Sequence, residues 1–100
     1  MEAVEGARFT LRLEREDAAN IVYRFEAELG GAASASGSVS VELGAGAVVV
    51  ASEPAIPQWL ESTIVGLMRS LWRARRDPKA AAPWPRRLTR WRHPEGAQIR

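Results

Sequence analysis

Apolar and polar residues alternate along the first half of the chain, which is the pattern of half-buried β-strands. The alternation runs through residues 9–13, 21–29 and 33–43, and residues 47–51 form a fourth segment that is apolar throughout. Polar or glycine-containing segments separate the four runs, and such segments typically form turns. The pattern therefore predicts an antiparallel meander of four strands.

The inward residues of these predicted strands all carry odd numbers, and this constrains the loops between them. Neighbouring antiparallel strands share one apolar face only if the numbers of opposed residues add to an even sum, which requires loops of odd length. We therefore predict loops at residues 16–20, 30–32 and 44–46, the last two with a glycine in the left-handed conformation. The predicted opposed pairs are Leu11 with Phe25, Phe25 with Gly37, Tyr23 with Val39, Val41 with Val49, Arg8 with Glu28, and Arg12 with Arg24.

The hydrophobic period changes after the fourth strand. Ser52 is a candidate N-cap, and prolines follow it at positions that tolerate them in a first helical turn. A helix over about residues 56–76 is predicted, ending before Asp77-Pro78. Its apolar stripe would cover the apolar face of the sheet. The residues of the stripe are Leu60, Ile64, Leu67, Met68 and Leu71.

These elements predict an α+β fold in which a four-stranded antiparallel meander precedes one long helix packed on one sheet face. Residues 1–78 form this domain, and residues 79–100 form an Ala/Pro linker and a short basic tail that contains Trp. Trp84, Leu88 and Trp91 stand at helical spacing, which favours a short helix from Pro85. An extended segment packed on the sheet edge is the alternative.

Charge divides the chain into two unlike halves. Residues 1–53 carry a net charge of −5 and residues 54–100 one of +7, and all four Trp lie in the second half. Arg binds phosphates in bidentate fashion and Trp stacks on bases, so this composition predicts an anionic partner, either nucleic acid or an acidic protein. The alternative is that the Trp residues cap the core while the Arg residues are solvated or pair with the acidic half. The residues expected to bind the partner are Arg73, Arg76, Arg86, Arg87, Arg90, Trp91 and Arg92.

Two further hypotheses come from the predicted fold. A curved sheet beneath one helix could form a cup for a small apolar ligand. A homodimer could form through an exposed edge strand, or through an outer sheet face on which the Ser residues of 34–40 lie near Val22, Val48 and Val50. An ordinary solvated face is the alternative for that surface. The residues expected to line the cup are Tyr23, Phe25, Leu60, Ile64 and Met68.

Catalysis and cofactor binding find no support in the sequence. The chain has no Cys and a single His, His93, so it offers no disulfide, no thiolate metal ligand and no catalytic triad. We predict no catalytic residue, no metal and no cofactor. No apolar run approaches the ~20 residues of a transmembrane helix, and the N-terminus does not resemble a signal peptide. The expected protein is a cytoplasmic, non-catalytic binding module.

Overall fold

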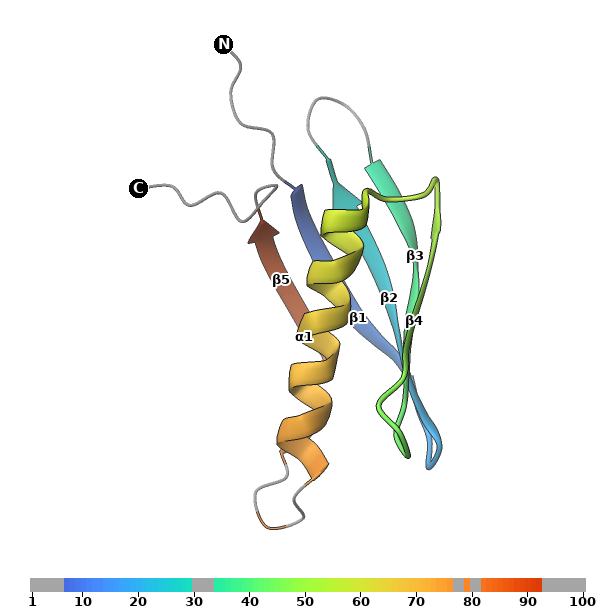
Figure 1. Cartoon of the computed structure of the whole chain (residues 1–100), viewed down its shortest axis with the longest axis vertical. Coiled ribbons are helices and arrows are strands. Elements are labelled where there is room, and N and C mark those ends of the chain that lie inside the picture. The colour runs from blue at the N-terminus through green and yellow to red at the C-terminus, as the bar shows by residue number, and fades with distance from the viewer. Residues whose placement is uncertain (1–6, 30–33, 77–78, 80–81, 93–100) are drawn as a thin grey trace, which may run out of the picture.

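Five antiparallel strands and one helix make up the computed structural model, which describes residues 7–29, 34–76, 79 and 82–92. The strands form a single sheet in the order β4-β3-β2-β1-β5, and the helix lies on one of its faces (Figure 1). The predicted α+β fold of a four-stranded meander followed by a helix is confirmed, and a fifth strand follows the helix. The elements are β1 (Ala7–Glu16), β2 (Asn20–Glu28), β3 (Ser34–Glu42), β4 (Val48–Glu53), α1 (Gln58–Arg76) and β5 (Arg87–Arg92).

The core lies between the sheet and α1. Odd-numbered side chains of the first three strands, such as Phe9, Tyr23 and Val39, are fully buried. Leu60, Ile64 and Met68 of the predicted helical stripe are also fully buried. The two periods seen in the sequence, two for the strands and about 3.6 for the helix, therefore meet in one hydrophobic cluster.

The predicted register of the first three strands is confirmed. Leu11 opposes Phe25, Phe25 opposes Gly37, and Tyr23 opposes Val39. A Cβ atom at Gly37 would collide with the backbone of Ala51 and Ser52 in β4, so only glycine fits there. On the outer face Arg8 opposes Glu28 and Arg12 opposes Arg24, as the parity rule requires.

The loop between β1 and β2 is shorter than predicted. A bulge between Leu13 and Arg15 shifts the register, so β1 continues to Glu16 and only three residues, 17–19, separate it from Asn20. The Asp17 carboxylate closes this turn by accepting hydrogen bonds from the backbone N–H groups of Ala19 (2.8 Å) and Asn20 (2.9 Å). The predicted loop at 30–32 lies outside the described residues.

The predicted register of β4 is wrong by one residue. Val41 opposes Val48, not Val49, because the turn holds four residues, 43–46, between the hydrogen-bonded residues Glu42 and Ala47. Gly46 has φ 77°, the left-handed conformation predicted for this turn, and the Trp72 ring packs where its Cβ would stand. The parity of β4 is therefore inverted.

The inverted parity of β4 corrects the prediction for the outer sheet face. Val48 and Val50 were expected beside Val22 on that face, but both are partly buried against the core. Val49 takes the outer position instead and is 62% exposed.

Ser52 was the predicted N-cap of the helix, but it lies within β4. The helix begins at Gln58, and the Pro57 carbonyl accepts hydrogen bonds from the N–H groups of Leu60 and Glu61.

The C-terminal segment is a strand, so the helix favoured from Pro85 is wrong and the extended alternative is confirmed. Trp84 is buried, with its ring centroid 6.4 Å from that of Tyr23. The Tyr23 hydroxyl donates to the Pro85 carbonyl (2.5 Å), and the Leu13 N–H donates to the Arg86 carbonyl (2.9 Å). These contacts direct the chain along β1, where β5 pairs in antiparallel fashion.

Candidate anion-binding surface

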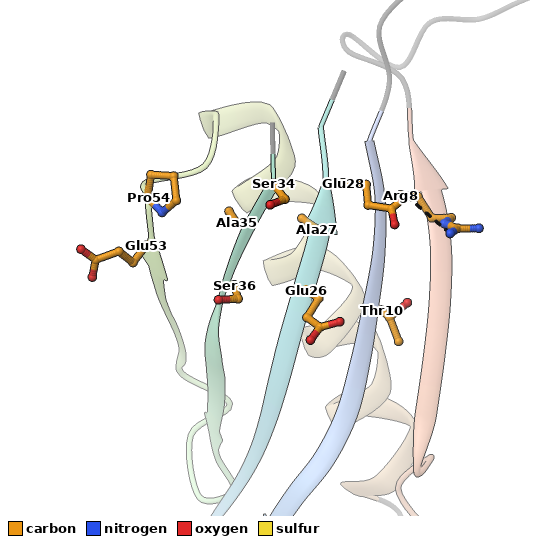
Figure 2. A pocket seen from close by; sticks show the side chains of 10 residues that line it. All are labelled: Arg8, Thr10, Glu26, Ala27, Glu28, Ser34, Ala35, Ser36, Glu53 and Pro54. Carbon is orange, nitrogen blue, oxygen red and sulfur yellow. Dashed lines mark hydrogen bonds and ion pairs between the residues drawn. The ribbon is translucent and has the colours of Figure 1, made fainter. Parts of the chain in front are cut away.

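The sheet face opposite α1 is open, and within the described part of the chain no element covers it (Figure 1). Polar side chains from β1, β2 and β3 project from this face (Figure 2). They include Arg8, Thr10, Glu26 and Ser36, which line a hollow of about 450 Å³. A second hollow of about 370 Å³ continues past Arg24 and Ser38 toward β4.

Three arginines stand directly side by side on this open face. Arg24 of β2 opposes Arg12 of β1, and Arg12 opposes Arg87 of β5. Opposed side chains in a sheet have Cβ atoms only about 5 Å apart, and like charges at that spacing destabilise the sheet. We call Arg24, Arg12 and Arg87 the arginine row.

The charges of the row are only partly balanced within the chain. Arg24 lies 3.8 Å from the Glu14 carboxylate. None of the ion pairs formed between described residues includes Arg12 or Arg87. The neighbouring Arg8 differs, because it opposes Glu28 and lies 3.4 Å from its Oε1 atom. The fold thus pairs opposite charges at Arg8 and Glu28, but places like charges side by side in the arginine row.

An exposed Trp lies on the same face as the arginine row. Alternation along β5 places Arg87, Thr89 and Trp91 on the open face, and Trp91 opposes Arg8 and is 57% exposed. Between them the hydroxyls of Thr89 and Thr10 lie 3.2 Å apart. Arg87 and Trp91 are four residues apart, or about 13 Å along the strand.

The residues predicted to bind an anionic partner do not form one surface. Arg87 and Trp91 lie on the open face, whereas the register places Arg90 on the side of α1, where its Nη1 donates to the Thr89 carbonyl (2.9 Å). Arg86 is exposed just before β5, and the side chain of Arg92 lies outside the described residues.

The two predicted helix residues lie on another element. Arg73 and Arg76 are exposed near the C-terminal end of α1, where the Arg76 guanidinium lies 4.9 Å from the Trp72 ring centroid. A hollow of about 360 Å³ beside Arg76 is also lined by Trp72 and Trp84. Strand β5 and the end of α1 are therefore separate candidates for anion binding.

Sequence reasoning missed Arg12 and Arg24 as site residues. Their opposition was visible from strand parity alone, but without β5 beside β1 the pair had no third arginine. Arg8 was likewise assigned only to its pair with Glu28. The missing signal was the pairing of β1 with a strand that follows it by some 75 residues, which periodicity does not reveal.

The five residues expected to line a ligand cup are all in the core. Tyr23, Phe25, Leu60, Ile64 and Met68 are each 0% exposed, so no solvent-sized space reaches them. None of them lines any of the hollows described on the surface. This filled core leaves a small apolar ligand no volume among these side chains.

The described residues also bear on metal and membrane binding. They contain no cluster of three or more His, Asp or Glu side chains able to hold a metal ion. None of their helices is long and apolar enough to cross a membrane. Comparison with protein-family models, curated proteins and solved structures found no match.

Proposed function

We propose that this protein is a non-catalytic binding module that holds single-stranded nucleic acid on the β1–β5 side of its open sheet face. The observation that carries the proposal is the direct opposition of Arg12 and Arg87, which lack a carboxylate partner among the described residues. A bound phosphate would supply the missing negative charge.

We call the part of the open face that carries Arg12, Arg87, Thr89 and Trp91 the strip, and its chemistry suits a single strand of nucleic acid. A guanidinium binds phosphate oxygens in bidentate fashion, so Arg12 and Arg87 would hold one phosphate or two adjacent ones. Trp91, about 13 Å along β5, would stack on a base, and Thr89 lies between them as a hydrogen-bonding group.

The width of the strip favours a single strand over a duplex. It spans two strands, β1 and β5, which is about 10 Å at the usual strand spacing. Glu26 and Glu28 of β2 border it and would repel a second phosphate backbone. The exposed Trp favours nucleic acid over an acidic protein, because a peptide carboxylate has no base to stack. We also propose that the protein is cytoplasmic, because single-stranded nucleic acid is available in the cytoplasm.

The test is a titration of the full chain with a mixed-sequence single-stranded oligonucleotide, followed by fluorescence anisotropy of a dye on the oligonucleotide. Replacing both Arg12 and Arg87 with Ala should weaken binding at least about tenfold. It should also make the log–log salt slope shallower by about 0.7 if they hold one phosphate and by about 1.4 if they hold two. Trp91→Ala should also weaken binding about tenfold, through lost stacking.

The matched control replaces Arg73 and Arg76 with Ala, because this pair removes the same charge from the helix. This control should bind the oligonucleotide more tightly than the Arg12/Arg87 double variant and Trp91→Ala do, with an affinity close to that of the parent protein. Equal losses in the two double variants would contradict a site on β1 and β5. Binding of a poly-Glu peptide with the same dependence on Arg12 and Arg87, and no binding of the oligonucleotide, would assign the surface to an acidic protein instead.

A further inference from the structure

The two edges of the sheet differ in chemistry. Edge strand β5 carries Arg87 and Arg90, and charges of this kind keep an exposed edge from pairing with another chain. The other edge, β4, reads Val-Val-Val-Ala-Ser from position 48 and has no charged residue before Glu53. Its register with β3 is regular from Val48 to Glu53, so no bulge interrupts the edge. Of the two edges that the described strands form, β4 is the one that lacks the usual protection.

The free backbone groups of β4 can be assigned from the turn before it. The Glu42 N–H donates to the Ala47 carbonyl (2.9 Å), which makes Glu42 and Ala47 a hydrogen-bonded pair. Because hydrogen-bonding direction alternates along a strand, Val49 and Ala51 also bond toward β3. The N–H and C=O groups of Val48, Val50 and Ser52 therefore point away from the sheet, at its free edge.

We propose that β4 pairs in antiparallel fashion with β4 of a second copy of this chain, around a two-fold axis at Val50. Equal parity of opposed residues keeps both apolar faces on one side, so Val50 would oppose Val50 of the second copy and Val48 would oppose its Ser52. The two sheets would become one continuous sheet. The Arg-bearing β5 strands would lie at its two outer edges.

The helix beside β4 has a charge pattern that complements itself under this symmetry. Strands β3 and β4 lie nearest to α1, which runs antiparallel to β4, with Trp72 against Gly46 at one end. One side of α1 lines a hollow of about 500 Å³ with Glu61, Val65 and Arg69. Glu61 and Arg69 stand four residues on either side of Val65. The two-fold axis proposed at Val50 also relates the two helices and makes them antiparallel. With Val65 of each helix beside this axis, each Glu61 would face Arg69 of the second copy.

Sedimentation equilibrium of the full chain tests the proposal. The mass should rise with protein concentration from 11.0 kDa toward twice that value. Val50→Pro should abolish this rise, because it removes an N–H at the free edge. Proline is tolerated at such edge positions, so circular dichroism should show that this monomeric variant remains folded. A constant mass of 11.0 kDa up to about millimolar concentration would overturn the proposal.

A charge exchange tests the geometry without relying on proline. Glu61→Arg and Arg69→Glu should each weaken the dimer about tenfold, since each opposes like charges twice across the axis. The double variant should restore dimerisation. Arg90→Glu makes the same change in charge on β5, at the opposite edge of the sheet from β4, and should leave the dimer intact. A dimer that ignores Val50→Pro and both reversals would use another surface and contradict this one. The proposed nucleic-acid strip lies at the far edge, so either idea can fail alone.

Discussion

A single buried hydroxyl joins β2 to the segment just before β5. Tyr23 on β2 is 0% exposed and donates to the carbonyl of Pro85, just before β5. Burial raises the pKa of Tyr23 to about 12, because the phenolate would lose its water, while the charge of Arg75 acts in the opposite direction. Ionisation of this one group is therefore coupled to unfolding.

We predict an alkaline loss of stability that depends on Tyr23. The pKa is 10.0 in the unfolded chain and about 12 in the folded one, so the neutral hydroxyl stabilises the fold fully below pH 10. That stability, about 3 kcal/mol, is lost as the pH rises from 10 to 12. Urea unfolding at pH 8, 10, 11 and 12 measures it. Tyr23→Phe should lower the free energy of unfolding by about 1 kcal/mol at pH 8. Above pH 10 the free energy of unfolding of this variant should decline less than that of the parent protein. An equal decline in both proteins would contradict the assignment.

At the scale of elements, one arginine ties the end of α1 to the segment that precedes β5. Arg75 donates from Nη1 to the Leu71 carbonyl (2.9 Å) and from Nη2 to the Pro83 carbonyl (2.9 Å). Its guanidinium also lies 5.1 Å from the ring centroid of the buried Trp84. This arginine is therefore bound to the chain's own carbonyls.

We expect Arg75→Ala to lower the free energy of unfolding by about 2 kcal/mol, since it removes hydrogen bonds from a charged donor and a stacking contact. Arg73→Ala is the matched control. It removes the same side chain two residues away, from an exposed position, and should change stability by less than about 0.5 kcal/mol. Thermal unfolding followed by circular dichroism compares the two. Equal effects would mean that the contacts of Arg75 contribute no net stability.

Strands β1 to β3 and α1 were predictable because each has a clear hydrophobic period. The same rule failed at β4, where residues 47–51 are all apolar and so do not distinguish one face from the other. The orientation of β4 depends on a turn one residue longer than expected, fixed by the left-handed Gly46 beneath Trp72. Local turn geometry of this kind leaves no trace in the period.

The C-terminal segment escaped prediction for a different reason. Trp84, Leu88 and Trp91 fit helical spacing, but the edge of β1 and the Tyr23 hydroxyl hold the chain extended. Both contacts join residues far apart in the sequence, and tertiary contacts override local spacing. The sequence therefore predicted Arg87 and Trp91 as binding residues, but not the residues beside them. Arg12 and Arg24 were recognisable only as an unfavourable pair, and the folded sheet places Arg87 next to Arg12.

For the whole molecule, the division of charge along the sequence does not become a division of the surface into two halves. Strand β5 from the basic half pairs with β1 from the acidic half, whose Arg8 and Arg12 lie beside it. The acids Glu26 and Glu28 occupy the next strand. The open face thus has a basic strip along β1 and β5. Glu26 and Glu28 of β2 border this strip opposite Thr10 and Arg8, whereas Arg24 extends it opposite Arg12.

This arrangement predicts that stability and binding respond in opposite directions to one substitution. Arg12→Glu would place a carboxylate between Arg24 and Arg87, and cross-strand pairs of this kind contribute up to about 1 kcal/mol each. We expect urea unfolding to show a gain of about 1 kcal/mol, while oligonucleotide binding falls at least tenfold. Arg8→Glu introduces the same charge opposite Glu28 and should destabilise the protein instead.

The comparison of these two variants decides whether the arginine row carries a cost in the free protein. A gain in stability for Arg12→Glu together with a loss for Arg8→Glu would show that the row is unfavourable until an anion binds, as expected where function opposes stability. If Arg12→Glu does not stabilise the protein, solvent already screens the three guanidinium groups. Their opposition would then give no reason to expect a partner at this face.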